Sequence, residues 1–215
     1  IGGAQAIAAL AYGTDSVRKV DVICGPGNIF VTMAKKLVYG DVGIDGLYGP
    51  TETVVLADET SNATLCAADL IAQAEHDPMA RPILITISEE LGIRVRSELI
   101  SRVQTLKRAK IIEASLKSHG IIAIVQNVEE GIELANEFAP EHLCITTKDP
   151  GSLIPLVRNA GMIFVGEFSH EVLGDYGAGP NHVLPTARTS RFSGGLSVLS
   201  YLRVRTWIAI DDSVA

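Results

Sequence analysis

The 215-residue sequence predicts an α/β fold built from mostly parallel sheets that are covered by helices. Two observations lead to this prediction. Short apolar runs rich in β-branched residues recur along the chain, as expected of strands that are buried on both faces. Longer helical patterns separate these runs, and this alternation is typical of parallel strands joined by helices.

The expected strands and helices follow one another in regular order. The strands span residues 20–24, 52–57, 82–87, 121–125, 143–146 and 162–165. The helices span residues 3–12, 30–38, 62–75, 90–105, 109–118, 128–138 and 151–159. At least one helix stands between each pair of consecutive strands, which is the kind of connection that parallel pairing requires.

A glycine-rich linker and a long irregular segment organise the chain. The linker DVGIDGLYGP, residues 41–50, favours a boundary near residue 51. We therefore expect a partial nucleotide-binding-like portion at 1–50, a main α/β domain at 51–195 and the start of a C-terminal tail at 196–215. From residue 166 to residue 186 the regular pattern weakens, and an irregular stretch of this length is more often functional than idle.

Composition narrows the class of partner and compartment. The net charge of -7, without a basic stripe, argues against a nucleic-acid binder. Three widely spaced cysteines suggest neither a disulfide framework nor a cysteine zinc site, so a reducing cytoplasm fits best. No apolar run approaches the roughly 20 residues of a membrane span, so we expect no membrane partner.

The stretch AQAEHD, residues 72–77, places polar side chains at the end of an expected helix. Gln73 and His76 are three positions apart, so adjacent helical turns bring them to one face, where two neutral ligands could converge. Asp69, one turn earlier, could orient such ligands. On the pair alone, a solvated helix end is the favoured alternative.

The stretch APEHLCIT places Glu141 and His142 directly before an apolar strand. A carboxylate beside an imidazole can divide the roles of acid and base, because their unperturbed pKa values of about 4.3 and 6.5 are within the range that enzymes tune. The alternative is a solvated charged pair in a loop between a helix and a strand.

Two glycine-rich stretches could approach a ligand closely. GDYGAGPNHVLPT, residues 174–186, concentrates Asp175 and His182 among glycines and prolines, which allow close backbone approach and hold the shape of a loop. GPGNIFVT, residues 25–32, leaves a strand and enters a helix whose N-terminus could bind a cofactor phosphate or carboxamide. A tight turn explains the second stretch equally simply.

Five motifs in order resemble histidinol dehydrogenase: GPGNIFVT, GPTE at 49–52, QAEH at 73–76, PEHL at 140–143 and GDYGAGPNHVLPT. The resemblance covers nearly the whole chain. It implies incomplete Rossmann-like units in an aldehyde-dehydrogenase-like architecture. It also implies a zinc-containing homodimer that oxidises L-histidinol to L-histidine with NAD, through a bound aldehyde, as the last step of histidine biosynthesis.

The resemblance assigns roles to the residues that match its motifs. It implies that Gln73, His76 and Asp175 are zinc ligands, and imidazole and oxygen donors suit zinc. It implies that Glu141 and His142 are the catalytic pair. His142 would take the alcohol proton, and Glu141 would activate the water that hydrates the aldehyde.

The same resemblance implies the binding contacts. The matching NAD contacts are Gln5 and Asn28. The matching substrate contacts are Thr51, Gln73, His76, His142, Asp175 and His182. A thirteen-residue loop that contains both Asp175 and His182 would close over the substrate.

Some features depart from the family pattern. A further zinc-ligand histidine and a substrate-contacting glutamate are expected from a C-terminal region that this sequence does not contain, and an N-terminal region is missing before Ile1. We therefore expect a central portion of the enzyme, with weak zinc binding and little turnover alone. His170 is an additional histidine, either a surrogate ligand or, as favoured, a surface residue.

Two other functions remain open. One is an NAD-linked dehydrogenase for another amino alcohol or aldehyde. A thiol mechanism of that kind needs a reactive cysteine, whereas Cys144 lies in an apolar strand, where a buried and inert thiol is expected. The other is a non-catalytic scaffold that retains the fold.

Overall fold

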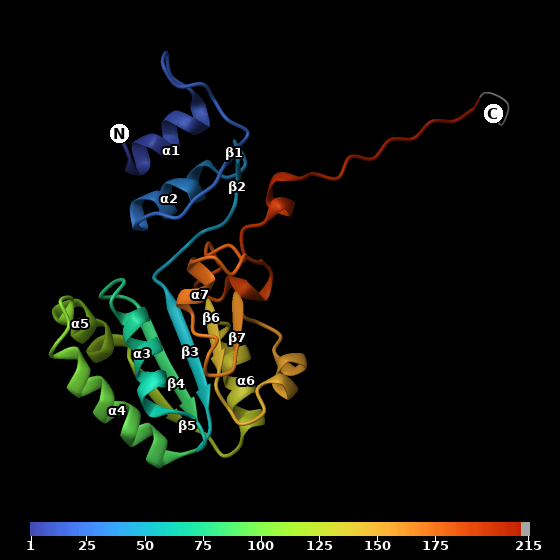
Figure 1. Ribbon diagram of the computed structural model, residues 1–215. Helices are drawn as coiled ribbons and strands as arrows, with labels where there is room; N and C mark the ends of the chain where they lie inside the picture. Colours follow the sequence, from blue (N-terminus) through green and yellow to red (C-terminus); the bar gives the residue numbers. More distant parts are fainter. Residues whose placement is uncertain (212–215) are drawn as a thin grey trace.

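The computed structural model describes residues 1–211, apart from the side chain of Asp175, and these residues form two parallel sheets (Figure 1). The larger sheet has the order β5-β4-β3-β6-β7, with every pair parallel. Its strands are β3 (Glu52–Ala57), β4 (Arg81–Thr86), β5 (Ile121–Ile124), β6 (His142–Ile145) and β7 (Met162–Val165). The order reverses between β3 and β6, as in a doubly wound sheet.

Helices cover both faces of this sheet (Figure 1). One face packs against α3 (Ala63–Ala74), α4 (Glu89–Val103) and α5 (Ala109–His119), and the other against α6 (Val128–Phe138) and the 3-10 helix η1 (Gly151–Leu156). Alternate strand residues point to opposite faces. Val55 and Cys144 therefore join the core under α3 and α4, whereas Val54 and Leu143 join the core under α6.

The N-terminal residues form a smaller unit with its own core. It contains α1 (Gly3–Tyr12), β1 (Val22–Ile23), α2 (Ile29–Val38) and β2 (Gly43–Ile44), and β1 pairs with β2 in parallel. The buried apolar residues of this unit are Ile7, Ala11, Ile23, Val38 and Val42. They pack the two helices against the short sheet.

A buried ion pair fixes the glycine turn that follows β1. Lys35 and Asp45 pair directly, and both side chains are almost fully enclosed. Lys35 Nζ also donates to the carbonyl oxygen of Gly25 (3.0 Å), and the amide of Gly25 donates to Asp45 Oδ2 (2.6 Å). Each buried charge thus has partners, as buried charges require.

The C-terminal part has little regular structure. It contains the short helix α7 (Val172–Asp175) and the 3-10 helices η2 (Thr189–Arg191) and η3 (Val198–Tyr201). Residues 202–211 are exposed and extend away from the two sheets (Figure 1). Among residues 1–211, none of the helices has both the length and the apolar content that crossing a bilayer needs.

The predicted α/β class is confirmed, and most predicted elements begin and end within two residues of the observed ones. The helix expected at 151–159 is wrong in type: η1 is a 3-10 helix that ends at Leu156. It contains Pro155, whose ring lacks the amide hydrogen that an α-helix interior needs. The linker at 41–50 also contains β2, which sequence periodicity cannot reveal in two residues.

Close packing at Gly161 joins β6 and β7 at the edge that carries the reactive side chains. Its amide donates to the carbonyl oxygen of Pro140 (2.9 Å), and the next amide, of Met162, donates to that of Glu141 (2.9 Å). A Cβ atom at Gly161 would lie 2.6 Å from the Glu141 carbonyl oxygen and 3.1 Å from Cδ of Pro185. Neither the backbone of Glu141 nor the ring of Pro185 can rotate away from such a Cβ atom.

We expect Gly161→Ala to lower the free energy of unfolding by about 1–3 kcal/mol, the usual cost of overpacking. Urea unfolding followed by circular dichroism measures the change. Gly151→Ala is the matched control, because no described atom lies within 4 Å of a Cβ there, and its effect should stay within about 0.5 kcal/mol. Equal losses from both variants would contradict the close-packing explanation.

Candidate active site

The candidate site lies at the amino ends of β3 and β6, the neighbouring strands where the strand order reverses. Thr51 directly precedes β3, and Glu141 directly precedes β6, whose first residue is His142. Ligands of doubly wound sheets usually bind beyond the carboxyl ends of the strands at such a point. In this protein the candidate side chains Thr51, Glu141 and His142 gather at the opposite end.

The carboxyl ends of the same two strands are closed by hydrogen bonds within the protein. The carboxylate of Asp58 accepts from the amide of Lys148 (2.7 Å) and from Thr60 Oγ1 (2.6 Å). Ser61 Oγ donates to the carbonyl oxygen of Thr146 (2.8 Å). These bonds satisfy the polar groups that a ligand would otherwise meet there.

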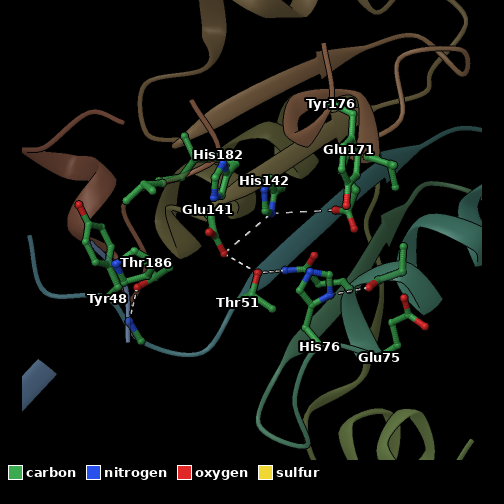
Figure 2. Close-up of a pocket in the computed structure, with 17 residues that line it drawn as sticks. Tyr48, Thr51, Glu75, His76, Glu141, His142, Glu171, Tyr176, His182 and Thr186 are labelled. Carbon is green, nitrogen blue, oxygen red and sulfur yellow. Dashed lines mark hydrogen bonds and ion pairs between the residues drawn. The ribbon is translucent and has the colours of Figure 1, made fainter. Parts of the chain in front are cut away.

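A cavity of about 550 Å³ opens at the amino edge. It draws on the turn after β1, the linker before β3, the end of α3, the start of β6 and the irregular segment 166–186 (Figure 2). The lining residues are Pro26, Tyr48, Gly49, Thr51, Ala72, Gln73, Glu75, His76, Glu141, His142, Glu171, Val172, Tyr176, His182, Val183, Leu184 and Thr186.

Strand register explains why these side chains meet. Thr53 stands opposite His142 in the parallel pairing of β3 with β6. By the alternation of strand side chains, both lie on the face that carries Val55 and Cys144, where α3 packs. Gln73 is near the C-terminal end of α3 and therefore reaches the ends of the two strands.

Glu141 is buried and oriented by two donors. Thr51 Oγ1 donates to Glu141 Oε2 (2.6 Å), and the amide of Glu52 lies 3.2 Å from the same oxygen. His142 Nδ1 lies 3.9 Å from Glu141 Oε2, and its ring packs at a tilt against Phe164 with centroids 5.9 Å apart. The predicted acid and base pair therefore faces one cavity.

Glu171 is a site residue to which the sequence analysis gave no role. It is 6% exposed and lines the cavity. Its Oε2 accepts from Thr53 Oγ1 (2.5 Å) and lies 4.0 Å from His142 Nδ1. Figure 2 shows Glu141, His142 and Glu171 converging beside Thr51. The only sequence signal is an acidic residue shortly before Asp175 in the irregular segment.

The amide of Gln73 is held on all sides, and it is 1% exposed. Its nitrogen donates to Glu171 Oε1 (3.0 Å) and Thr53 Oγ1 (3.1 Å), and its oxygen accepts from the amide of Glu52 (3.0 Å) and from Thr51 Oγ1. The opposite orientation would turn the amide oxygen toward the Glu171 carboxylate, where it finds only acceptors. Thr51 has one hydroxyl hydrogen, which Glu141 and Gln73 therefore share.

His76 directs one ring nitrogen at a backbone carbonyl oxygen of its own helix. Its Nδ1 lies 2.9 Å from the carbonyl oxygen of Ala72. When Nδ1 carries the hydrogen, Nε2 keeps its lone pair, and ligating histidines usually donate their other nitrogen to such a partner. Among the described side chains, no three of His, Cys, Asp and Glu are grouped around a possible metal position. The side chain of Asp175, the third expected ligand, lies outside the described part of the chain.

The remaining predicted residues divide into two groups. His182 lines the cavity. Gln5 and Asn28 are not among the residues that line the cavity. Gln5 is exposed on α1. Asn28 caps α2, because its side-chain oxygen accepts from the amides of Phe30 (3.1 Å) and Val31 (3.2 Å). Their NAD contacts stay predictions. His170 is exposed and outside the cavity lining, consistent with the expected surface position.

Asp69 is buried beneath the site, and burial raises the pKa of its carboxyl to about 6 from an ordinary value of 3.8, while His170 opposes the rise. Within the described residues, the hydrogen bonds of Gln73 go to Thr51, Glu52, Thr53 and Glu171, and none goes to Asp69. Asp69 therefore does not orient Gln73 as the helical spacing predicted.

We expect Asp69→Asn to stabilise the metal-free, full-length protein by about 2 kcal/mol at pH 7. A raised folded pKa means that the folded state holds its proton more tightly, so wild-type stability falls as pH rises from 3.8 to about 6. The difference should vanish near pH 3, below both the ordinary pKa of 3.8 and the raised pKa of about 6, where the carboxyl is protonated in the folded and unfolded states alike. Urea unfolding at several pH values measures it. Asp21→Asn, at an exposed position, provides the baseline, and a gain independent of pH would contradict the burial explanation.

A solved structure with the same architecture identifies the class of fold. The chain resembles an acetylating aldehyde dehydrogenase from Geobacillus thermoglucosidasius with a TM-score of 0.55 and 16% identity, covering 89% of this chain and 58% of that one. At this identity the likeness shows the fold alone. The parallel sheets covered by helices are thus an α/β fold with the aldehyde-dehydrogenase-like architecture.

Closer relatives identify the family. The family model described as histidinol dehydrogenase matches residues 1–215. The crystal structure of histidinol dehydrogenase from Elizabethkingia anophelis aligns with a TM-score of 0.89 and 38% identity, covering 93% of this chain and 46% of that one. The chain belongs to the histidinol dehydrogenase family.

Curated sequences agree with this assignment. Histidinol dehydrogenase from Dehalococcoides mccartyi (strain CBDB1) is 52% identical over 210 residues, which cover 98% of this chain and 48% of that protein. The enzyme from Prochlorococcus marinus subsp. pastoris (strain CCMP1986) is 52% identical over 212 residues, with 99% and 50% covered. The chain spans about half the length of the curated relatives it matches.

Proposed function

We propose that the full-length protein oxidises L-histidinol to L-histidine through a bound aldehyde, with NAD as the hydride acceptor, in the last step of histidine biosynthesis. The observation that carries the proposal is the pair Glu141 and His142, facing one cavity beside Thr51 in a chain of this family. A dehydrogenase of this kind needs a base for an alcohol and a base for a water, and the pair offers both.

In the first oxidation, His142 takes the proton of the substrate hydroxyl. The electron pair of the O–H bond then forms the second bond of the carbonyl group, and the carbon loses its hydrogen as hydride. NAD, when bound, accepts that hydride. The ring of His142 packs at a tilt against Phe164, with centroids 5.9 Å apart, and this contact would help to orient the base toward the substrate.

In the second oxidation, Glu141 takes a proton from the water that adds to the aldehyde. The hydrate anion that forms then loses a second hydride, which leaves the carboxylic acid, and this acid releases its remaining proton to solvent to give the carboxylate of L-histidine. Thr51 and the amide of Glu52 hold Oε2 of Glu141, which keeps the carboxylate at the cavity where the water would add. The two residues therefore serve different steps.

Zinc would be held by His76 through Nε2 and by Gln73 through its amide oxygen, with Asp175 as the third expected ligand. The donor set fits, because imidazole and oxygen ligands suit zinc. Zinc would supply orientation and charge for the substrate. Since the Gln73 oxygen already accepts from Glu52 and Thr51, binding requires one of these contacts to be exchanged.

The proposed assembly and compartment follow from the family and from composition. We propose a homodimer in the cytoplasm, on the resemblance of the motifs and on the three unpaired cysteines. L-histidinol is the proposed partner, and neither a nucleic acid nor a membrane is proposed.

The cysteines weigh against the alternative of a thiol mechanism. Burial raises the pKa of Cys144 well above its ordinary value and that of Cys66 to about 11. A nucleophilic cysteine needs a lowered pKa and access to the substrate. No cysteine is among the described residues that line the cavity. Acid and base catalysis by Glu141 and His142 is therefore better supported than a thiol mechanism. If the full-length protein shows no turnover, the remaining alternative is a non-catalytic scaffold.

We expect zinc-dependent NADH production from L-histidinol by the full-length protein, lost on chelation and recovered with zinc. His142→Asn should lower histidinol oxidation about 10²–10⁴-fold, the usual effect of losing a general base. Glu141→Gln should lower oxidation of L-histidinal by a similar factor. Absorbance at 340 nm measures both reactions. Absence of turnover with zinc and NAD present would overturn the proposed function.

We expect His76→Ala to weaken zinc binding by at least about 100-fold, more than the roughly 10- to 100-fold cost of losing an outer hydrogen-bond partner of a ligand. Competition with a chromophoric chelator measures the affinity of the full-length protein. His119→Ala, at the end of α5 and outside the cavity lining, is the control and should bind zinc as the wild type does. Unchanged affinity in His76→Ala would remove it from the ligand set.

A further inference from the structure

We infer that Glu171 is a positioning residue: its buried carboxylate holds the imidazole of His142 in the orientation that accepts the alcohol proton. The inference rests on the proposed function, because it concerns the base of the first oxidation. It adds a residue from the irregular segment, which neither the motif pair at residues 141–142 nor the expected zinc ligands include.

The carboxylate of Glu171 is itself held in place. Thr53 Oγ1 donates to Oε2 at 2.5 Å, and the Gln73 amide donates to Oε1 at 3.0 Å. Both donors come from the packed body of the domain, Thr53 from β3 and Gln73 from α3. Both are at most 1% exposed. Two bonds to buried donors leave the carboxylate little rotational freedom, so it can serve as a fixed reference for a neighbour.

His142 lies with Nδ1 toward this carboxylate. Nδ1 is 4.0 Å from Glu171 Oε2 and 3.9 Å from Glu141 Oε2, and the imidazole side chain is 13% exposed. A hydrogen on Nδ1 is favoured where two carboxylate oxygens face it, and Nε2 then keeps the lone pair that a base needs. Catalytic hydrogen bonds are often long before substrate binds and shorten in the complex.

Glu171 suits this role better than Glu141 does. Glu141 already accepts from Thr51 and Glu52, and it is the group proposed to change protonation in the second oxidation. Glu171 has no such task in the proposed reaction. Glu171 belongs to the segment that follows β7, whereas His142 is the first residue of β6. The carboxylate therefore approaches the imidazole from outside the strand that carries it.

Thr53 allows the role of Glu171 to be tested at a residue outside the cavity lining. Its side chain is fully buried and is not part of the cavity lining, so it is not placed to touch the substrate. Its hydroxyl donates to Glu171, which lies beside His142. Thr53→Val keeps the shape and removes this donor. The same hydroxyl accepts from the amide of Gln73 (3.1 Å), so a change in the first oxidation at unchanged zinc content is the result that assigns the effect of Thr53→Val to Glu171.

The experiment uses the full-length protein with zinc and NAD, and it compares oxidation of L-histidinol with oxidation of L-histidinal. We expect Glu171→Gln to lower kcat for L-histidinol about 10- to 100-fold, the usual cost of losing an orienting partner. KM for L-histidinol and kcat for L-histidinal should stay within about 3-fold, since Glu141 serves the second step. Thr53→Val should act in the same direction, and the double variant should lose no more than Glu171→Gln alone.

Glu167→Gln is the matched control. Glu167 precedes Glu171 in the same segment, accepts from the amide of Asn62 and is not among the residues that line the cavity. It should keep wild-type rates in both reactions. Thermal unfolding and zinc content are measured for every variant, so that loss of fold or metal is separated from loss of positioning.

Each outcome decides the inference. Equal loss of both oxidations in Glu171→Gln, or recovery of its activity by added zinc, would overturn the inference and assign Glu171 to general stability or to Gln73. Wild-type rates in Glu171→Gln would also overturn it. If the wild-type protein itself does not oxidise L-histidinol, the proposed function fails instead, and the two failures are thereby distinguished.

Discussion

The parallel pairing of β3 with β6 is the contact on which the site depends. Its register sets Thr53 opposite His142, and it brings the amide of Glu52 to the carboxylate of Glu141, 89 residues further along the chain. A shift of one residue would turn His142 to the other face of the sheet, under α6. The apolar residues that fix this register, such as Val55 and Cys144, therefore also fix the distance between the reactive groups.

Two carboxylates beside one imidazole are tolerated because hydrogen-bond donors face both of them, and the two donors to Glu141 are shared with the oxygen of Gln73. Glu141 accepts from Thr51 and Glu52, and Glu171 accepts from Thr53 and Gln73. Buried charge is costly unless hydrogen bonds replace the water that was lost. The amino edge can hold these charges because the irregular segment after β7 returns across it. At the carboxyl edge, the polar groups of Asp58, Ser61 and Thr146 form hydrogen bonds within the protein instead.

The sequence predicted the fold where the pattern was periodic, and the site where residues near each other in sequence carried the chemistry. Strand β3 and helix α6 were predicted with the observed bounds, because long apolar periodicity admits few alternatives. Glu141 with His142, and Gln73 with His76, are local motifs. The contact of Thr53 with Glu171 spans 118 residues. No local sequence pattern predicts this contact, because threonine in a strand and glutamate in a loop are both common.

The fully paired amide of Gln73 has a consequence for the energetics of the proposed zinc binding. Each of its hydrogens and its oxygen has a protein partner, so the contacts within the protein already satisfy this amide. If zinc binds as proposed, its bond to the amide oxygen would compete with the contacts from Glu52 and Thr51. The affinity for zinc would then be the difference between the free energy of the new zinc bonds and that of the protein contacts they replace. Small changes around Thr51 would shift this difference in either direction.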